Sequence, residues 1–325
     1  MQTPFTPDST TLPFRLKLRH MVLLDALGDS LSLRKAANMA NLTQPAATRA
    51  IAELESAFGV LLFERSPRGM APTVFGEALI RHARQLLFDV QRAHEEIQAL
   101  RSGSDGLVRV GVLLSSAVKL LPMAIGEVKR RYPRLRISLE QLSQPPLIAR
   151  LRDGSLDVIL CRLVTDASVA EHLDQTVLFD DDFVLVAART HRLAKAKAVA
   201  IGDLIDQPWV LPHSSSALYD HVRALFLTQA GRLPSNVVES TTSLVTNLML
   251  IERYGYLNFM QRTVAQTYVQ RGVLRVLPLS LGSPLGPHVV AVRKDLSHPP
   301  AMTAFLDALK EMVKPEAAPT REQIP

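Results

Sequence analysis

The period of the apolar positions along the chain changes once, near residue 102. From residue 16 to residue 100 they recur with a helical period, interrupted by one short Pro/Gly-rich segment. Beyond residues 102–106, apolar strand patterns alternate with amphipathic helix patterns. The Gly, Ser and Asp residues of that stretch predict the main domain boundary. We therefore expect a helical N-terminal part and a larger α/β part.

Residues 32–55 contain two short helical patterns in close succession. Ser32 is a suitable N-cap for the first helix, and Thr43 is suitable for the second, whose first turn tolerates Pro45. Each helix has an apolar face at the spacing i, i+3, i+4 and i+7. These faces consist of Leu33, Ala36, Ala37 and Ala40 in the first helix and of Ala47, Ala50, Ile51 and Leu54 in the second. Such small faces predict two closely packed helices.

The outward side of the second helix carries Gln44, Pro45, Thr48 and Arg49. In a helix-turn-helix the start of the second helix enters the major groove, where Gln can pair with adenine and Arg with guanine. The free backbone N–H groups at Thr43 also favour a phosphate. We therefore predict a DNA-reading surface. The alternative is a helical hairpin whose outer face is only solvated.

A hairpin pattern follows the two helices. We expect a strand over residues 60–63, a Pro/Gly turn carrying Arg65 and Arg68, and a short return strand. Alone, such a turn is most often a charged loop. Beside a reading helix, two arginines at a hairpin tip suit phosphate or minor-groove contact. The combination indicates a winged helix-turn-helix.

The next helix has an apolar seam whose steps alternate between four and three residues, as in the a and d positions of a coiled coil. The seam consists of Leu79, Ala83, Leu86, Val90, Ala93, Ile97 and Leu100. It favours a partner helix and hence a dimer, which would present two reading helices to an imperfect palindrome. A long helix that packs its stripe on its own domain is the alternative.

Beyond residue 106 we expect strands over residues 107–113, 134–142, 156–161, 182–188, 256–260 and 287–295. Helices are expected over residues 116–132, 147–154, 217–230, 243–254 and 302–313. This alternation predicts parallel, doubly wound sheets in two α/β lobes with a ligand cleft between them. The strand over residues 287–295 is expected to cross back to the first lobe.

The composition adds few constraints. An apolar content of 47% can supply real cores, and the single cysteine, Cys161, excludes an intramolecular disulfide, as expected in a reducing cytosol. The net charge of +6 favours polyanions without establishing a partner. The chain has no signal-peptide pattern and no long uncharged apolar run, so we expect a soluble, cytoplasmic protein.

The run SLSLRKAANMANLTQPAATRAIAELESAFGVLLFERSPRGMAPTVFG, within residues 16–76, resembles the winged helix-turn-helix of LysR-type transcriptional regulators. Family members usually have serine where this chain has Thr43 and Thr48, and both residues keep a hydroxyl. The resemblance implies a DNA-binding transcriptional regulator without enzymatic activity. The DNA-contacting residues that it implies are Ser32, Thr43, Gln44, Pro45, Thr48 and Arg49 in the helices and Arg65, Arg68 and Thr73 in the wing.

The run LIARLRDGSLDVILC is similar to the C-terminal, periplasmic-binding-protein-like part of the same family, so that the resemblance covers about residues 16–313. It implies a small-molecule effector between the two lobes. The candidate effector contacts are Ser115, Ser116, Arg162, His213, Ser214 and the rest of residues 213–216, Thr242 and Ser243. Such groups suit an organic anion or a hydroxylated metabolite, and no other cofactor is implied. Serines that cap helices and a surface arginine are the plain alternatives.

The expected organisation is a disordered leader (1–14), a winged helix-turn-helix (15–75), a linker and dimerisation helix (76–104), an effector-binding domain (105–314) and a disordered tail (315–325). Lobe I would comprise residues 105–178 and 284–314, and lobe II residues 179–283. The expected partners are double-stranded promoter DNA, further copies of the chain in a dimer and a tetramer, and the effector. RNA polymerase is a further candidate, and no membrane is expected.

No catalytic or metal site is predicted, because the chain has no GxGxxG, Walker, HExxH or GxSxG motif and its histidines do not fall at ligand spacings. Asp180, Asp181 and Asp182 raise a metal hypothesis. Consecutive side chains point in different directions, however, so a solvated turn is predicted instead. The alternative function is a cytosolic metabolite-binding protein or enzyme whose helical part only dimerises.

Overall fold

The computed structural model describes residues 16–66, 69–102, 105–118, 120–214, 216, 218–240, 243–282, 284–294 and 298–312. The expected leader and tail lie outside these ranges. The chain divides into two compact units, of which one comprises residues 1–107 and 148–157 and the other residues 108–147 and 158–325.

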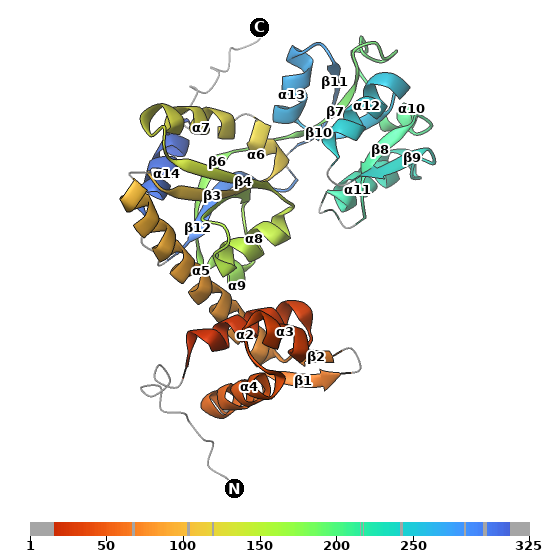
Figure 1. Ribbon diagram of the computed structural model, residues 1–325. Coiled ribbons are helices and arrows are strands. Elements are labelled where there is room, and N and C mark those ends of the chain that lie inside the picture. Colours follow the sequence, from red (N-terminus) through yellow and green to blue (C-terminus); the bar gives the residue numbers. More distant parts are fainter. Residues whose placement is uncertain are drawn as a thin grey trace. The chain divides into compact units, whose positions relative to one another are not determined.

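In the described part of residues 18–102, the first unit has three helices, a hairpin and a long helix (Figure 1). They are α2 (Leu18–Ser30), α3 (Leu33–Met39), α4 (Gln44–Phe58), β1 (Phe63–Ser66), β2 (Gly69–Pro72) and α5 (Val74–Ser102). Leu23, Leu24 and Leu27 of α2 are fully buried in the core. The alanines expected on the facing sides of α3 and α4 are in the same core. The prediction of two closely packed short helices is therefore confirmed.

The strand expected over residues 60–63 is wrong in its position, because β1 begins only at Phe63. One oxygen of the Glu55 carboxylate on α4 accepts the backbone N–H groups of Leu62 (2.9 Å) and Phe63 (3.3 Å). These bonds hold residues 62 and 63 against the helix, and the hairpin pairing begins with Phe63 opposite Pro72. Arg65 consequently lies within β1, opposite Met70 of β2, and not in the turn.

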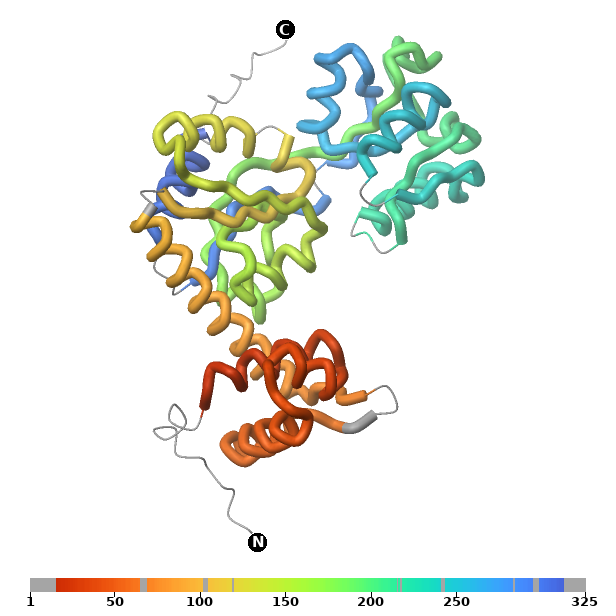
Figure 2. Tube along the Cα trace, in the orientation of Figure 1, coloured from red at the N-terminus to blue at the C-terminus, as the bar shows by residue number. Residues whose placement is uncertain are grey.

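Beyond residue 106 the chain forms two lobes, and lobe I has a five-stranded sheet in the order β4-β3-β5-β12-β6. Its strands are β3 (Leu107–Val112), β4 (Arg136–Gln141), β5 (Val158–Arg162), β6 (Leu173–Phe179) and β12 (His288–Arg293). Its helices are α6 (Leu114–Val118), α7 (Leu120–Arg131), α8 (Gln144–Asp153), α9 (Ala167–Ala170) and α14 (Pro300–Met312). The C-terminal β12 and α14 complete this lobe beside β5 and α7, so the predicted return of the chain is confirmed (Figure 2).

Lobe II has a second five-stranded sheet in the order β11-β7-β10-β8-β9. Its strands are β7 (Phe183–Ala188), β8 (Trp209–Pro212), β9 (Val237–Ser240), β10 (Leu257–Gln261) and β11 (Leu274–Gly282). Its helices are α10 (Ile201–Leu204), α11 (Tyr219–Ala230), α12 (Leu244–Tyr254) and α13 (Arg262–Gln270). One core contains buried side chains of α10 and α11, and a separate core contains those of α12 and α13.

The prediction of purely parallel sheets is wrong, because both sheets are mixed. In lobe I, β12 runs antiparallel to both β5 and β6. In lobe II, β7 runs antiparallel to both β10 and β11. The chain passes from β6 directly into β7 and returns from β11 to β12, so these strands enter their sheets without the helical crossover that a parallel neighbour needs. The helix expected over residues 116–132 corresponds to α6 and α7, and residue 119 between them lies outside the described residues.

Candidate nucleic-acid interface and effector site

The start of α4 is an exposed polar surface on a rigid support. Thr43 is the N-cap of the helix, and its side-chain oxygen accepts the backbone N–H of Ala46 at 3.3 Å. The predicted reading residues Gln44, Pro45, Thr48 and Arg49 are all exposed. The hydroxyl of Thr48 donates to the carbonyl oxygen of Gln44 at 3.0 Å, and its oxygen can still accept a hydrogen bond. This surface offers amide, guanidinium and methyl groups to a groove.

The polar surface at the start of α4 is supported by alanines that pack α4 against α3. Ala36 and Ala37 of α3 and Ala47 of α4 are almost completely buried. Small side chains at a helix contact allow the two backbones to approach closely. The outward residues of α4 therefore project from a helix whose inner face is held by the core.

The other predicted DNA contacts occupy different situations. Ser32 is the N-cap position of α3 without a side-chain cap hydrogen bond, and its backbone N–H donates to the Ser30 hydroxyl at 3.3 Å. Thr73 uses its hydroxyl inside the protein, where it donates to the carbonyl oxygen of Leu61 at 2.8 Å and accepts the N–H of Gly76 at 3.1 Å. Arg68 and the side chain of Arg65 lie outside the described residues.

The seam of α5 divides into two parts. Ala83 is fully buried in the core of the first unit, and Leu79 packs against the same core. From Leu86 onward the seam residues are exposed, and the exposed fraction reaches 78% at Leu100. Leu79 and Ala83 therefore pack on their own domain, as the alternative interpretation expects. The seam positions from Leu86 to Leu100 are not covered by any described part of the single chain.

Ion pairs fasten α5 within the first unit. The Arg84 guanidinium pairs with Asp25 at 2.7 Å and also with Asp29, both of which belong to α2. Farther along the helix, Arg92 pairs with Asp157 at 2.6 Å and donates to the carbonyl oxygen of Gly154 at 2.9 Å.

In lobe I, the predicted contacts Ser115 and Ser116 are buried beside His288 of β12. The hydroxyl of Ser115 lies 2.9 Å from Nε2 of His288, and the hydroxyl of Ser116 lies 3.1 Å from its Nδ1. The imidazole also stacks on Phe179, with ring centroids 4.7 Å apart. Burial, and then the charge of Arg162, lower the pKa of His288 to about 3, so this imidazole is neutral near pH 7.

Arg162 lies at the end of β5, opposite His288 in the sheet register, and its side chain is buried. Its Nη1 donates to the carbonyl oxygen of Gly286, and its guanidinium lies 5.5 Å from the centre of the Phe183 ring. Nη2 is buried and has no hydrogen-bond partner within the described residues. Burial lowers the pKa of Arg162, partly offset by the charges of Asp181 and Asp180. A buried, incompletely paired guanidinium is a good anchor for an anion.

The solvated turn predicted over residues 180–182 is wrong at Asp181, which is only 3% exposed. One of its carboxylate oxygens accepts the backbone N–H of Thr263 at 3.1 Å, and the other has no hydrogen-bond partner within the described residues. Burial raises the pKa of Asp181, and the hydrogen bonds from Thr263 and then the charge of Arg162 oppose this shift. Asp180 is exposed and Asp182 is partly buried, so only the middle residue of the run is enclosed by the protein. The described residues contain no group of three or more His, Cys, Asp or Glu side chains suited to a metal ion.

The remaining predicted effector residues form a separate group in lobe II. His213 and Ser214 follow the end of β8 and are exposed, and the His213 imidazole lies 3.9 Å from the Glu239 carboxylate of the neighbouring parallel strand. Ser243 precedes α12 and donates its hydroxyl to Thr246 at 2.7 Å. Thr242 lies outside the described residues.

Sequence reasoning missed His288 and Asp181 as members of the cluster around Arg162. His288 is separated from Ser115 by 173 positions, and no local pattern connects them. The only signal for Asp181 was the run of three aspartates, which was interpreted as a turn.

Two family profiles match the chain. The one described as "LysR substrate binding domain" matches residues 101–314, and the one described as "Bacterial regulatory helix-turn-helix protein, lysR family" matches residues 18–77. Among curated relatives, the HTH-type transcriptional regulator GbpR of Azospirillum brasilense is 32% identical, over 94% of this chain and 89% of that protein. The uncharacterized HTH-type transcriptional regulator YdcI of Escherichia coli (strain K12) is 26% identical, over 91% of this chain and 96% of that protein.

Solved structures share the fold. ArgP of Mycobacterium tuberculosis has a TM-score of 0.66 at 16% identity and covers 92% of this chain and 97% of its own. CbnR, a LysR family transcriptional regulator, has a TM-score of 0.61 at 19% identity and covers 92% of this chain and 100% of its own. Among the described helices, none has the length and apolar character needed to cross a bilayer.

Proposed function

The chain belongs to the LysR family of DNA-binding transcriptional regulators, which carry an effector-binding domain, and from this premise we propose which residues read DNA. The exposed edge of α4 enters the major groove, with Gln44, Thr48 and Arg49 at the bases and the helix start at Thr43 against a phosphate. Ser32, Pro45, Arg65, Arg68 and Thr73 belong to the same interface. The observation that carries this proposal is the exposure of the α4 edge on a helix whose opposite face is buried.

LysR regulators form oligomers, and we propose that this chain dimerises through the exposed half of the α5 seam. Two copies of α4 would then face an imperfect palindrome in promoter DNA. A tetramer, contact with RNA polymerase and action in the cytoplasm are the further parts of this proposal. No catalytic step is assigned to the chain, since the family consists of regulators.

The DNA-reading proposal is tested with Arg49→Ala and the DNA upstream of the chain's own gene, by fluorescence anisotropy. Loss of one bidentate base contact weakens specific binding by about 1–3 kcal/mol, or roughly five- to 150-fold. Binding to an unrelated duplex should change far less. Lys310→Ala, an exposed lysine on α14, is the control. Equal affinities of Arg49→Ala and the control for the upstream DNA would exclude Arg49 from base contact.

We further propose that the cluster of Arg162, Asp181 and His288, with Ser115 and Ser116 behind it, forms part of the effector site. The unpaired Nη2 of Arg162 supports an organic anion or a hydroxylated metabolite as the ligand. His213, Ser214, Thr242 and Ser243 would contribute from lobe II. The effector can shift the regulator between states only through a difference in its affinity for them.

The effector proposal is tested by a thermal-shift screen of small carboxylates and hydroxylated acids on the full chain. Stabilisation of a few degrees is expected for a ligand well above its Kd. Arg162→Met should abolish the shift, whereas Arg189→Met, an exposed arginine just after β7, should keep it. A ligand whose shift survives in Arg162→Met would bind elsewhere, and the proposed role of Arg162 would be wrong.

A further inference from the structure

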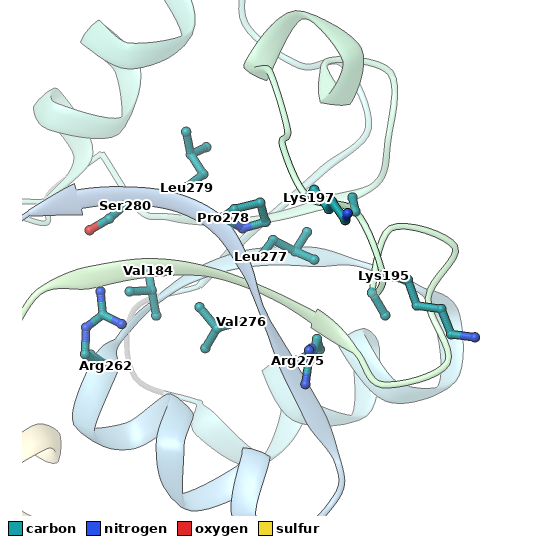
Figure 3. Close-up of a pocket in the computed structure, with 12 residues that line it drawn as sticks. Val184, Lys195, Lys197, Arg262, Arg275, Val276, Leu277, Pro278, Leu279 and Ser280 are labelled. Atoms are coloured by element: carbon teal, nitrogen blue, oxygen red, sulfur yellow. The ribbon is translucent and has the colours of Figure 1, made fainter. Parts of the chain in front are cut away.

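A pocket of about 580 Å³ lies along β11, the edge strand of the lobe II sheet (Figure 3). None of its lining residues belongs to the cluster around Arg162 and His288. It is therefore a separate feature from the proposed effector site.

The pocket forms where the pairing of β11 is interrupted. Val276 lies opposite Val186 of β7, and Ser280 lies opposite Val184. Three residues of β11 thus face a single residue of β7, and the edge strand bulges. Pro278 is at the centre of this bulge, where its missing N–H costs no ladder hydrogen bond.

The inner surface of the pocket is apolar. Val184 and Leu277 are each 1% exposed, so the cores on either side of the sheet hold them in place. Val276, Pro278 and Leu279 are the apolar lining residues that remain partly or fully exposed, so they form the accessible apolar surface. An apolar surface of this kind can cover the hydrocarbon part of a small ligand.

The rim of the pocket is cationic. Among its twelve lining residues are Lys195, Lys197, Arg262 and Arg275, and none is acidic. Arg262 is partly neutralised by Asp182 at 3.2 Å, whereas no ion pair is recorded for the other three within the described part of the chain. Figure 3 shows Lys195 and Arg275 toward one end of the pocket and Arg262 toward the other. The rim therefore carries an uncompensated positive charge next to an apolar surface.

We propose that this pocket is a second ligand site, which binds small organic anions with an apolar body and a carboxylate or phosphate group. The apolar body lies on Pro278 and Leu279, which line the pocket and are accessible, and the acid group is held by Lys195, Lys197 and Arg275. The site is independent of the proposed effector site and would add a second chemical input to the regulator. Lysines near this strand could also serve only to protect the exposed sheet edge from pairing with another chain. The experiment below separates ligand binding from edge protection.

The experiment is isothermal titration of the full chain with three probes in wild-type and Arg162→Met backgrounds. Benzoate has an apolar body and a charge, benzyl alcohol has the body alone, and inorganic phosphate has the charge alone. Benzoate should bind about tenfold more tightly than either of the others. Its binding in the Arg162→Met background should persist, which separates this site from the effector site. Loss of benzoate binding in that background, or phosphate binding as tight as that of benzoate, would overturn the proposal.

Two variants test the residues. Lys195→Glu combined with Lys197→Glu reverses the rim charge and should weaken benzoate about tenfold. Ala196→Phe fills the pocket without changing its charge and should weaken it to a similar degree. The matched control combines Lys294→Glu with Lys310→Glu, two exposed lysines of lobe I, and should bind like wild type. If Ala196→Phe binds benzoate normally, or if the rim and control double variants behave alike, the pocket is only a basic sheet edge.

Discussion

At the scale of single residues, the largest departure from expectation is the number of polar side chains buried near the passage between the lobes. Arg162, Asp181 and His288 are each no more than 5% exposed. Their charges and hydrogen bonds are mutually dependent, because burial strengthens every electrostatic interaction among them. The lone Cys161 is different, since burial raises its pKa to about 12 and leaves the thiol protonated and unreactive.

The neutral state of His288 predicts a dependence of stability on pH. The pKa is about 3 in the folded protein, below the ordinary value of 6.5. The unfolded chain therefore binds more protons between these values, and stability that is present above pH 6.5 is lost as the pH falls toward 3. The loss is about 1 kcal/mol per pH unit in that window.

Thermal unfolding of wild type and His288→Gln between pH 4 and pH 7 measures this dependence. The wild-type midpoint should fall more steeply on acidification than that of His288→Gln. His172→Gln, which removes an exposed imidazole, should keep the wild-type slope. Parallel curves for wild type and His288→Gln would contradict the buried neutral state.

At the scale of elements, the junction of hairpin and linker helix depends on a close backbone approach. A Cβ atom added at Gly76 would lie 2.0 Å from the carbonyl oxygen of Leu62, a backbone atom that cannot move away easily. Gly76→Ala should therefore destabilise the first unit by about 1–3 kcal/mol. Denaturant unfolding followed by circular dichroism measures the change.

Gly126 in α7 provides the control, because nothing lies within 4 Å of its added Cβ. Gly126→Ala should be neutral or stabilise by up to about 1 kcal/mol, as expected for alanine in a helix. If both substitutions had the same effect, the contact at Gly76 would be ruled out as the cause.

Farther along α5, the ion pair between Arg92 and Asp157 attaches residues 148–157 to this helix. Asp157 is only 10% exposed, so removal of its guanidinium partner leaves a charge in a poorly solvated position. Arg92→Met should cost about 2 kcal/mol in local stability and speed hydrogen exchange over residues 148–157. Arg81→Met, at an exposed position of the same helix, should leave that exchange unchanged. Similar exchange in both variants would show that the ion pair contributes nothing to the attachment.

Elements whose signal is local could be predicted from the sequence. The spacing of Ala36, Ala37, Ala47 and Leu54 was enough for the two short helices, because each apolar face lies within a few turns of one helix. Short strands such as β8 and β9 were missed, since four residues give too little alternation to detect. The cluster around His288 could not be predicted from the sequence, because its members come together only through the pairing of distant strands in the folded sheet.

At the scale of the whole molecule, the apolar side chains on the exposed half of α5 have no covering partner within the described residues of a single chain. Leu86 and Val90 are each 50% exposed, and Ile97 is 56% exposed. A stripe of apolar side chains at heptad spacing is stable in water only when another helix covers it. This requirement supports assembly through α5.

Leu86→Lys tests assembly through this stripe, because a lysine ammonium in the seam would face its counterpart in the second copy. Sedimentation velocity should show a shift from dimers or larger species to monomers at micromolar concentration. Gln85→Lys adds the same charge beside the seam and should remain associated. Dimers that persist in Leu86→Lys would mean that another interface suffices.

The bond between Glu55 and the start of the hairpin limits how this regulator can adapt to its targets. Since the Glu55 carboxylate on α4 binds the backbone of Leu62 and Phe63, it ties the start of the hairpin to the helix that carries the proposed groove-reading edge. If α4 reads bases and the hairpin holds phosphates, as proposed, the distance between these two contacts within one half-site is set inside each subunit. Under the same proposal, operators that differ in length are accommodated between subunits, by bending of the DNA or by rearrangement of the proposed dimer.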